Sequence, residues 1–395
     1  MNASGGLRGM AWDHPRARNP LAAISAEWSR ASGVAVAWDA RPLKDFEDQP
    51  LEELAAAYDL VLIDHPFVGV AATSGLIVPV DDWTDPAFLA DQAAHSVGAS
   101  FPSYTWAGKQ WALAIDAACQ VSAVRSDLWA ARQFGALPDS WVDVLDLARR
   151  THGTHGQVAI ALNPNHAYCA FLSIGVSLVG ESFWPAATCV DRPAARESLE
   201  MLRQLAAQVH PGSRTDDPIG ISDRMAGTAE ILYVPLMFGY SSYARAGFRS
   251  HPLTFADAPR GRAGRHGSVL GGVGLALSAR SSQRAAAADL ARSIGGSQAQ
   301  SGIYVNTGGQ PGHAAAWDSP RANAQVGGFF RATRRTIEQA FMRPRVAGHR
   351  QFQPLAGELI HRFIWLGESS AETCLQAFDR LVDALLWNTA HRAVV

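Results

Sequence analysis

The chain repeats one tripeptide, Asp-His-Pro, at two places where an apolar segment ends. Residues 7–12 lead into Asp13-His14-Pro15, and residues 60–63 lead into Asp64-His65-Pro66. A carboxylate beside an imidazole can bind a polar solute or exchange protons near neutral pH. Ligands of open α/β sheets bind outside the carboxyl ends of the strands, so two parallel strands would bring both pairs to one edge. We therefore expect a polar site at that edge.

The same tripeptides also have a purely structural interpretation. Proline suits the first turn of a helix, so each segment predicts a helix start. Asp13 and Asp64 could then serve only as caps that accept backbone N–H bonds. Both interpretations stay open here, and the repetition favours a functional one.

The elements that must position these residues follow an alternating order. Strand patterns at 7–12, 34–38 and 59–63 are separated by helix patterns, which is typical of a doubly wound βαβ lobe. From about residue 151 to 250 the pattern is mainly helical, apart from expected strands at 158–162 and 231–238. A further strand is expected at 274–278, and helices after residue 323. At 395 residues the chain predicts two domains.

Composition excludes several classes of protein. The 34 basic and 36 acidic residues give a formal net charge of -2, so we expect no nucleic-acid partner. The four cysteines are scattered without a Cys-x-x-Cys pair, which excludes a disulfide-built scaffold. The longest apolar stretch, near 171–179, is too short to span a bilayer. The first six residues lack the features of a secretory signal, so we expect either a shortened chain or a cytoplasmic protein.

The motifs of common enzymes are missing from the sequence. There is no Gly-x-Ser-x-Gly elbow and no phosphate-binding loop, and the glycines of 267–274 lack the dinucleotide spacing. His152 and His155 could face one metal ion, but the glycines that flank them favour a loop. We therefore expect no catalytic residue, no metal site and no cofactor.

Four segments carry a resemblance to a known family. They are residues 58–83, which contain Gly75-Leu76-Ile77-Val78-Pro79-Val80-Asp81-Asp82-Trp83, and residues 108–141, 233–240 and 271–278. In order and spacing they resemble the extracellular solute-binding proteins of family 1, which serve ABC importers and have the type II periplasmic-binding fold.

The resemblance implies an α/β fold of two discontinuous lobes joined by hinge strands. The implied lobes are 1–116 with 256–308, and 117–255 with the helix-rich 309–395. It further implies a monomer in the periplasm that captures a small polar solute, such as a carbohydrate or sugar acid, between the lobes and presents it to ABC permease subunits. No chemical change to the solute is implied. The alternative is an intracellular enzyme or ligand sensor on the same fold that uses the Asp/His cluster.

The resemblance places the ligand at strand ends and hinge strands. The residues expected there are Trp12, Asp13, His14, Asp64, His65, Trp106, Trp111, Asp116, Tyr240, Gly271, Gly272 and Arg343. Aromatic rings can stack on sugar faces, although core packing is the alternative for each tryptophan. The glycines would let backbone amides approach a ligand, or would serve the chain itself. Arg16, Arg18, Arg245 and Arg343 could each fork onto a carboxylate, with a solvated surface position as the alternative.

Overall fold

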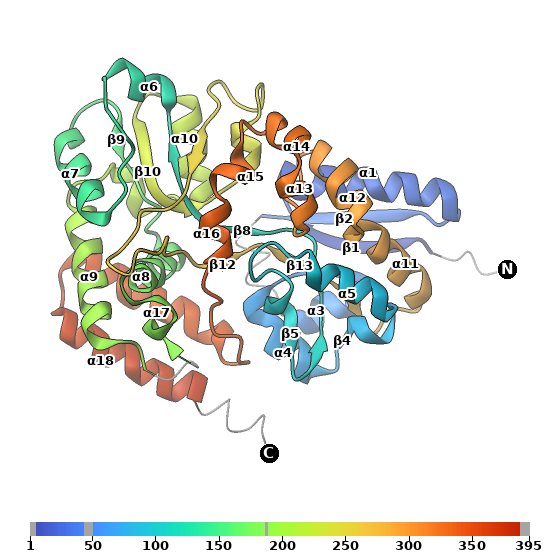
Figure 1. Ribbon diagram of the computed structural model, residues 1–395. Coiled ribbons are helices and arrows are strands. Elements are labelled where there is room, and N and C mark those ends of the chain that lie inside the picture. Colours follow the sequence, from blue (N-terminus) through green and yellow to red (C-terminus); the bar gives the residue numbers. More distant parts are fainter. Residues whose placement is uncertain (1–4, 43–49, 186–188, 388–395) are drawn as a thin grey trace. The chain divides into compact units, whose positions relative to one another are not determined.

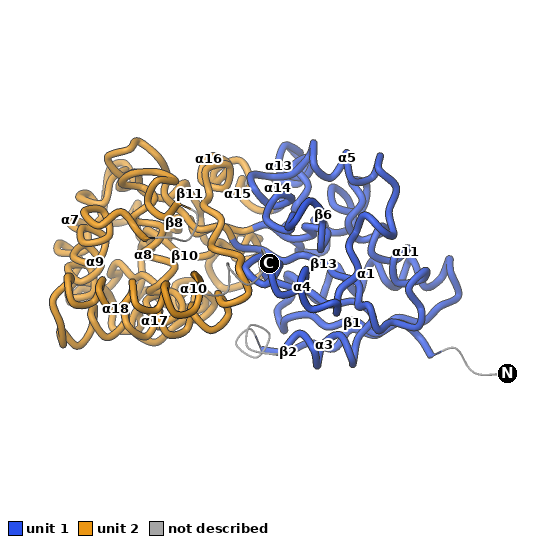
Figure 2. The backbone as a smooth tube through the Cα atoms, turned by 90° about the horizontal axis from the view of Figure 1, so that it is seen from below, with its two compact units in different colours: residues 1–117, 271–325 blue, residues 118–270, 326–395 orange. Residues whose placement is uncertain are grey.

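Strands and helices alternate over most of the chain (Figure 1). The computed structural model describes residues 5–42, 50–185 and 189–387. Residues 1–4 lie outside the described residues. They belong to the first six residues, in which we expected no secretory signal. The chain forms two compact units, which we call unit 1 (1–117 with 271–325) and unit 2 (118–270 with 326–395; Figure 2).

A mixed sheet forms the centre of unit 1, in the order β2-β1-β3-β13-β4, with β7 beside β13. Its strands are Leu7–Trp12 (β1), Val36–Arg41 (β2), Leu60–Asp64 (β3), Ile77–Val78 (β4), Leu113–Ala114 (β7) and Val273–Ser278 (β13). β1 pairs in parallel with both β2 and β3, whereas β13 runs antiparallel to β3. Because β1 and β3 are parallel neighbours, the two Asp-His pairs leave the sheet at the same edge.

Unit 1 also contains helices, some between its strands and some after the last strand, β13. They are Pro15–Ser32 (α1), Leu51–Ala57 (α3), Val68–Ser74 (α4), Pro86–Ala94 (α5), Arg284–Gly295 (α11), Ser297–Ala299 (α12), Ala314–Asp318 (α13) and Pro320–Gln325 (α14), with a small hairpin of Thr105–Trp106 (β5) and Lys109–Gln110 (β6). The apolar runs of β3 and β13 are buried along almost their whole length, as expected of strands covered on both faces. The sheet and helices α1, α3, α4 and α11 share one hydrophobic core.

The sheet of unit 2 has the order β11-β8-β10-β9, with β12 beside β8. Its strands are Ala118–Val124 (β8), Gln157–Val158 (β9), Ile231–Phe238 (β10), Thr254–Ala256 (β11) and Leu270–Gly271 (β12), the last of which passes into unit 1. The strand expected at 231–238 is confirmed. The strand expected at 158–162 is wrong beyond Val158, because the backbone N–H groups of Ile160 and Leu162 donate to Ser213 (3.2 and 2.9 Å) instead of to a neighbouring strand.

The remaining part of unit 2 is helical. Its helices are Ser126–Ala131 (α6), Trp141–Thr151 (α7), Pro164–Val179 (α8), Arg192–Ala206 (α9), Pro218–Gly227 (α10), Phe329–Ala332 (α15), Arg334–Glu338 (α16), His349–Leu366 (α17) and Ala371–Leu381 (α18). α8 is buried along nearly its whole length and packs against α9 and α17 (Figure 1). This burial explains its long apolar run. Among the described helices, none combines the length and apolar character that crossing a membrane requires.

The division into units differs from the expected lobes at two of three crossings. Residues 256–270 belong to unit 2, where Ala258 donates to the Thr336 hydroxyl (3.0 Å) and the Ser268 hydroxyl donates to the backbone of Gln120 (2.7 Å). Residues 309–325 belong to unit 1, where Ala117 donates to the backbone oxygen of Gln310 (3.0 Å). The first crossing, expected after residue 116, follows residue 117. Hydrogen bonds between distant segments therefore decide these boundaries.

Candidate functional site

The first Asp-His pair starts α1 with its histidine. His14 is the N-cap residue, and its Nδ1 atom accepts the backbone N–H of Arg16 (3.1 Å). The His14 side chain is buried, whereas Asp13 is half-exposed and pairs with Arg18 (2.8 Å). The capping interpretation is therefore wrong for Asp13.

The second pair reverses these roles. Asp64 caps the short 3-10 helix His65–Phe67, and its Oδ1 atom accepts the backbone N–H of His65 (2.8 Å). The same oxygen lies 3.2 Å from His65 Nδ1, and the imidazole is only 1% exposed. The capping interpretation is correct for Asp64. A carboxylate that accepts one N–H bond still has further lone pairs, so capping leaves ligand binding by Asp64 as a prediction.

Asp116 is held by Arg16 in unit 1. The Arg16 Nε atom donates to Asp116 Oδ2 (2.8 Å) and its Nη2 atom donates to Oδ1, so the guanidinium forks onto the carboxylate. Both side chains are buried, and burial raises the pKa of Asp116 while Arg16 opposes the rise. The fork expected for Arg16 is found with a protein carboxylate, and the surface alternative is wrong for this residue.

The first crossing segment is tied to the sheet of unit 1 through Asp116. Its backbone exchanges two hydrogen bonds with Val273 at the start of β13 (3.2 and 3.1 Å). Gly272 precedes Val273 and has a positive φ of 102°. A Cβ atom at Gly272 would lie 2.3 Å from the backbone oxygen of Asp116. The chain itself therefore requires this glycine, and ligand binding by Gly271, in β12, and by Gly272 stays a prediction.

The three tryptophans predicted as ring platforms all contribute to the core of unit 1. Trp12 is buried. Trp106 and Trp111 lie at the β5–β6 hairpin, are partly buried against the core, and share a hydrogen bond from the Trp111 indole to the backbone oxygen of Trp106 (3.0 Å). Trp12 thus packs in the core, and ligand contact by any of the three rings stays a prediction.

In unit 2, Tyr240 follows the end of β10. It is the N-cap residue of the 3-10 helix Ser241–Ala244, and its ring packs edge-on against Tyr243 with centroids 6.5 Å apart. The side chain is largely buried. Tyr240 therefore occupies a strand end, as expected, and its contact with a ligand stays a prediction.

Arg343 lies in the loop between α16 and α17. It is 4% exposed, so the surface alternative is wrong, and it donates to the side-chain oxygen of Gln353 (3.0 Å). Gln353 in turn donates to the side-chain oxygen of Asn165 at the start of α8. This chain of hydrogen bonds holds a cationic group beside the N-terminus of a buried helix.

Sequence reasoning missed His166, which lies in the first turn of α8. Its Nδ1 atom donates to the side-chain oxygen of Asn163, the N-cap residue (2.9 Å), and its ring packs edge-on against Phe238 at the end of β10. Burial lowers the pKa of His166 to about 3, and the charge of Arg343 acts in the same direction. The sequence signal was the Asn163-Pro164 pair, which marks a helix start.

Two further features, the histidines His152 and His155 and a cavity in unit 2, do not involve these strand ends. His152 and His155 are exposed after α7, as the loop interpretation expected. A cavity of about 380 Å³ in unit 2 is lined by α7, α8, α9 and the 260–264 loop, and it includes none of the predicted ligand-binding residues.

No family model matches the chain, and no curated protein matches it. Solved structures do match over nearly the whole length. Maltose-bound MalE3 of T. maritima has a TM-score of 0.84 at 17% identity, covering 97% of this chain and 100% of that one. An ABC transporter solute-binding protein from Agrobacterium radiobacter K84 in complex with ribitol has a TM-score of 0.82 at 18% identity, covering 97% and 99%.

A third solved structure that matches the chain holds a ligand of another kind. UgpB from Mycobacterium tuberculosis in complex with glycerophosphocholine has a TM-score of 0.79 at 15% identity and covers 100% of both chains. Identities this low establish the fold alone. The expected fold class is confirmed: the chain has the α/β fold of ABC transporter solute-binding proteins, and the resemblance drawn from its four segments holds at the level of the fold.

Proposed function

We propose that the chain is the solute-binding protein of an ABC importer and that it captures a small polar solute, most simply a carbohydrate or a sugar acid. The fold is matched over its full length by proteins whose structures hold maltose, ribitol and glycerophosphocholine. These ligands share several hydroxyl or oxygen groups on a small frame. The resemblance further implies a periplasmic monomer that delivers the solute to permease subunits.

One observation carries the proposal: two Asp-His pairs leave parallel neighbouring strands at the same edge of the unit 1 sheet. Asp64 accepts hydrogen bonds, and the imidazoles of His14 and His65 can donate or accept them, which suits hydroxyl groups that do both. Both imidazoles are buried in unit 1. The site therefore favours polyhydroxylated ligands over apolar ones.

Two residues of unit 2, Tyr240 and Arg343, are also predicted to bind the solute. Tyr240 has a hydroxyl and a ring, and Arg343 has donors in a fixed planar geometry. A carboxylate or phosphodiester on the solute would suit Arg343, whereas a neutral sugar would suit Tyr240 and the partly buried Trp106 and Trp111. We propose that a neutral sugar, a polyol and a sugar acid are the first solutes to compare.

A thermal-shift screen tests the proposal. The panel contains maltose, ribitol, mannitol, glucuronate and glycerophosphocholine, each at millimolar concentration. A ligand at 100 times its Kd stabilises the native state by about 2.7 kcal/mol, so at least one compound should raise the Tm by several degrees. A panel extended to all common sugars and sugar acids that never moves the Tm would contradict the proposal.

The recovered solute distinguishes a receptor from an enzyme. After prolonged incubation with the protein, the stabilising compound should be recovered unchanged by NMR. A new product that disappears in the His65→Gln variant would support the alternative, an enzyme that uses the Asp/His cluster. The His155→Gln variant, altered at an exposed histidine, is the matched control.

A further inference from the structure

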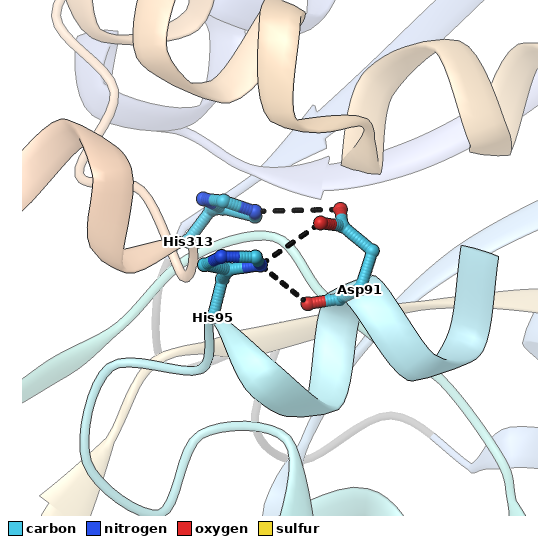
Figure 3. A group of neighbouring side chains, drawn as sticks. All are labelled: Asp91, His95 and His313. Atoms are coloured by element: carbon cyan, nitrogen blue, oxygen red, sulfur yellow. Dashed lines mark hydrogen bonds and ion pairs between the residues drawn. The ribbon is translucent and has the colours of Figure 1, made fainter. Parts of the chain in front are cut away.

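Outside the proposed solute site, three potential metal ligands converge in unit 1. Asp91 lies on α5, His95 directly follows that helix, and His313 precedes α13 (Figure 3). Asp91 Oδ1 lies 2.8 Å from His95 Nδ1, and Asp91 Oδ2 lies 3.5 Å from His313 Nε2. The two imidazole rings are stacked with their centroids 5.0 Å apart. One ligand atom from each residue lies within 4.8 Å of the others.

The backbone holds these side chains together without any ion. Ala314 donates to the backbone oxygen of His95 (2.6 Å), and Val97 donates to that of Gly312 (3.1 Å), so the segments on either side of the cluster are paired. Asp91 and His95 are four residues apart, which places them on one side of α5. A metal ion at this position would require side-chain adjustments and little movement of the backbone.

The donor set indicates which ions suit it. Two imidazole nitrogens and one carboxylate oxygen are typical ligands of Zn²⁺ and of neighbouring divalent ions such as Co²⁺ and Cu²⁺, whereas Mg²⁺ prefers oxygen ligands. His313 is buried, while Asp91 and His95 are each more than a third exposed, so water can complete the coordination. We propose that Asp91, His95 and His313 form a binding site for a zinc-class divalent ion.

Binding exchanges existing contacts for metal–ligand bonds. In the metal-free arrangement His95 Nδ1 faces both the carboxylate and the backbone oxygen of Asp91 (2.8 and 3.0 Å), and the ion replaces the proton that it shares with them. His313 Nδ1 accepts the N–H of Ala315 across a long 3.3 Å contact. If His313 ligates through Nε2, its proton moves to Nδ1 and this weak cap is lost. The site should therefore bind more weakly than a four-ligand structural zinc site.

An ion bound at this cluster would also affect a neighbouring segment of unit 1. The loop that carries His313 also contacts the last residues of unit 1 before the first crossing. Gly312 donates to Ile115 (3.3 Å), and the Gln310 side chain donates to the backbone oxygen of Ala117 (2.8 Å). An ion that joins α5 to this loop therefore stabilises the segment that anchors the first crossing.

The test uses the full chain without an affinity tag, titrated with ZnCl₂ in a calorimeter. We expect one saturable site per chain and a higher Tm with Zn²⁺, and no effect of MgCl₂. His95→Ala and Asp91→Asn alter exposed side chains, so they should fold and weaken Zn²⁺ binding by about 10- to 100-fold or more, at least the loss expected on removing an outer-shell partner. His155→Ala, which removes an exposed histidine elsewhere, should bind Zn²⁺ like the wild type.

A spectroscopic measurement identifies the ligands directly. Bound Cu²⁺ should give an electron paramagnetic resonance spectrum with couplings from two imidazole nitrogens, reduced to one in His95→Ala. The proposal is overturned if the wild type shows no Zn²⁺ site, or if His95→Ala and Asp91→Asn bind Zn²⁺ as tightly as His155→Ala. These outcomes do not depend on the solute screen, so the two proposals can fail separately.

Discussion

The two Asp-His-Pro segments have the same sequence but different structures. At the end of β1 the histidine caps the helix and the aspartate faces solvent. At the end of β3 the aspartate caps and contacts the histidine, and the helix starts one residue earlier in the motif. The tripeptide thus specifies a helix start at a strand end, and leaves open which of its polar residues provides the cap.

The residue after each proline also differs in its role. Arg16 follows the first segment and is buried in its ion pair with Asp116, so the start of α1 is fixed to the first crossing segment. Phe67 follows the second segment and ends a short 3-10 helix. The first segment therefore combines a candidate ligand site with a structural anchor, whereas the second places a buried imidazole beside a carboxylate.

The largest expected effect comes from removing that anchor. Asp116→Ala leaves Arg16 as a buried charge without its carboxylate, and such losses cost about 3–5 kcal/mol. Urea unfolding should show this decrease in the free energy of unfolding. Arg18→Met, which removes the exposed ion pair of Asp13, is the matched control and should cost less than about 1 kcal/mol. Equal losses in both variants would refute the contrast between anchor and surface pair.

Measuring the free energy of unfolding over a pH series extends the comparison to a third helix start, that of α8 in unit 2. His166 donates through Nδ1, whereas His14 accepts through Nδ1, and burial lowers the pKa of His166 to about 3. The unfolded chain takes up this proton near its ordinary pKa of about 6.5, so native stability is complete above that pH and decreases as the pH falls toward 3. This residue should contribute up to about 1.4 kcal/mol per pH unit.

The His166→Gln variant isolates that contribution. Its free energy of unfolding should fall less steeply than that of the wild type between pH 6.5 and 4.5, as measured by urea unfolding at each pH. Parallel curves for the two proteins would show that His166 is not held neutral by burial.

A smaller effect is expected from the cap at β3. Asp64→Ala removes the acceptor for the His65 N–H and should cost about 1 kcal/mol, within the roughly 0.5–2 kcal/mol typical of caps. Asp64→Asn keeps a side-chain acceptor and should restore most of that stability. Should the alanine variant unfold at the wild-type urea midpoint, Asp64 would not act as a cap.

The smallest effect is expected at Asp13. Its exposed pair with Arg18 should contribute roughly 0.2–1 kcal/mol, and this contribution should disappear in 1 M NaCl. Thermal unfolding of Asp13→Ala at low and high salt measures it. A loss as large as that of Asp64→Ala, unchanged by salt, would mean that the two segments are equivalent after all.

Local patterns predicted several elements, and the resemblance of four segments to a known family implied the fold class. The ends of β1 and β10 follow from apolar runs that stop at Asp13 and at Gly239, and their bounds agree with the expected 7–12 and 231–238. What the sequence could not predict depends on partners distant in the chain. Arg16 is buried because Asp116 lies beside it, and residues 309–325 join unit 1 through backbone bonds such as Ala117 to Gln310. Spacing along the chain contains no direct signal for such pairs.

The candidate site was also predictable only where it depends on local patterns. Strand-end positions such as His65 and Tyr240 follow from local patterns, but the capping roles depend on where each helix begins. Two interpretations were open for Gly272, ligand approach and a requirement of the chain itself, and the backbone oxygen of Asp116 confirms the second. His166 was missed because its significance arises from burial beside Phe238 and Arg343, which are distant in sequence.

Calorimetric titration of the most stabilising solute into wild type, His65→Gln and Tyr240→Ala tests the central claim most directly. We predict one solute per wild-type chain and a loss of at least tenfold in affinity, about 1.4 kcal/mol, in each variant, because both residues are predicted to bind the solute. Unchanged affinity in both correctly folded variants would contradict a solute site built from these strand ends.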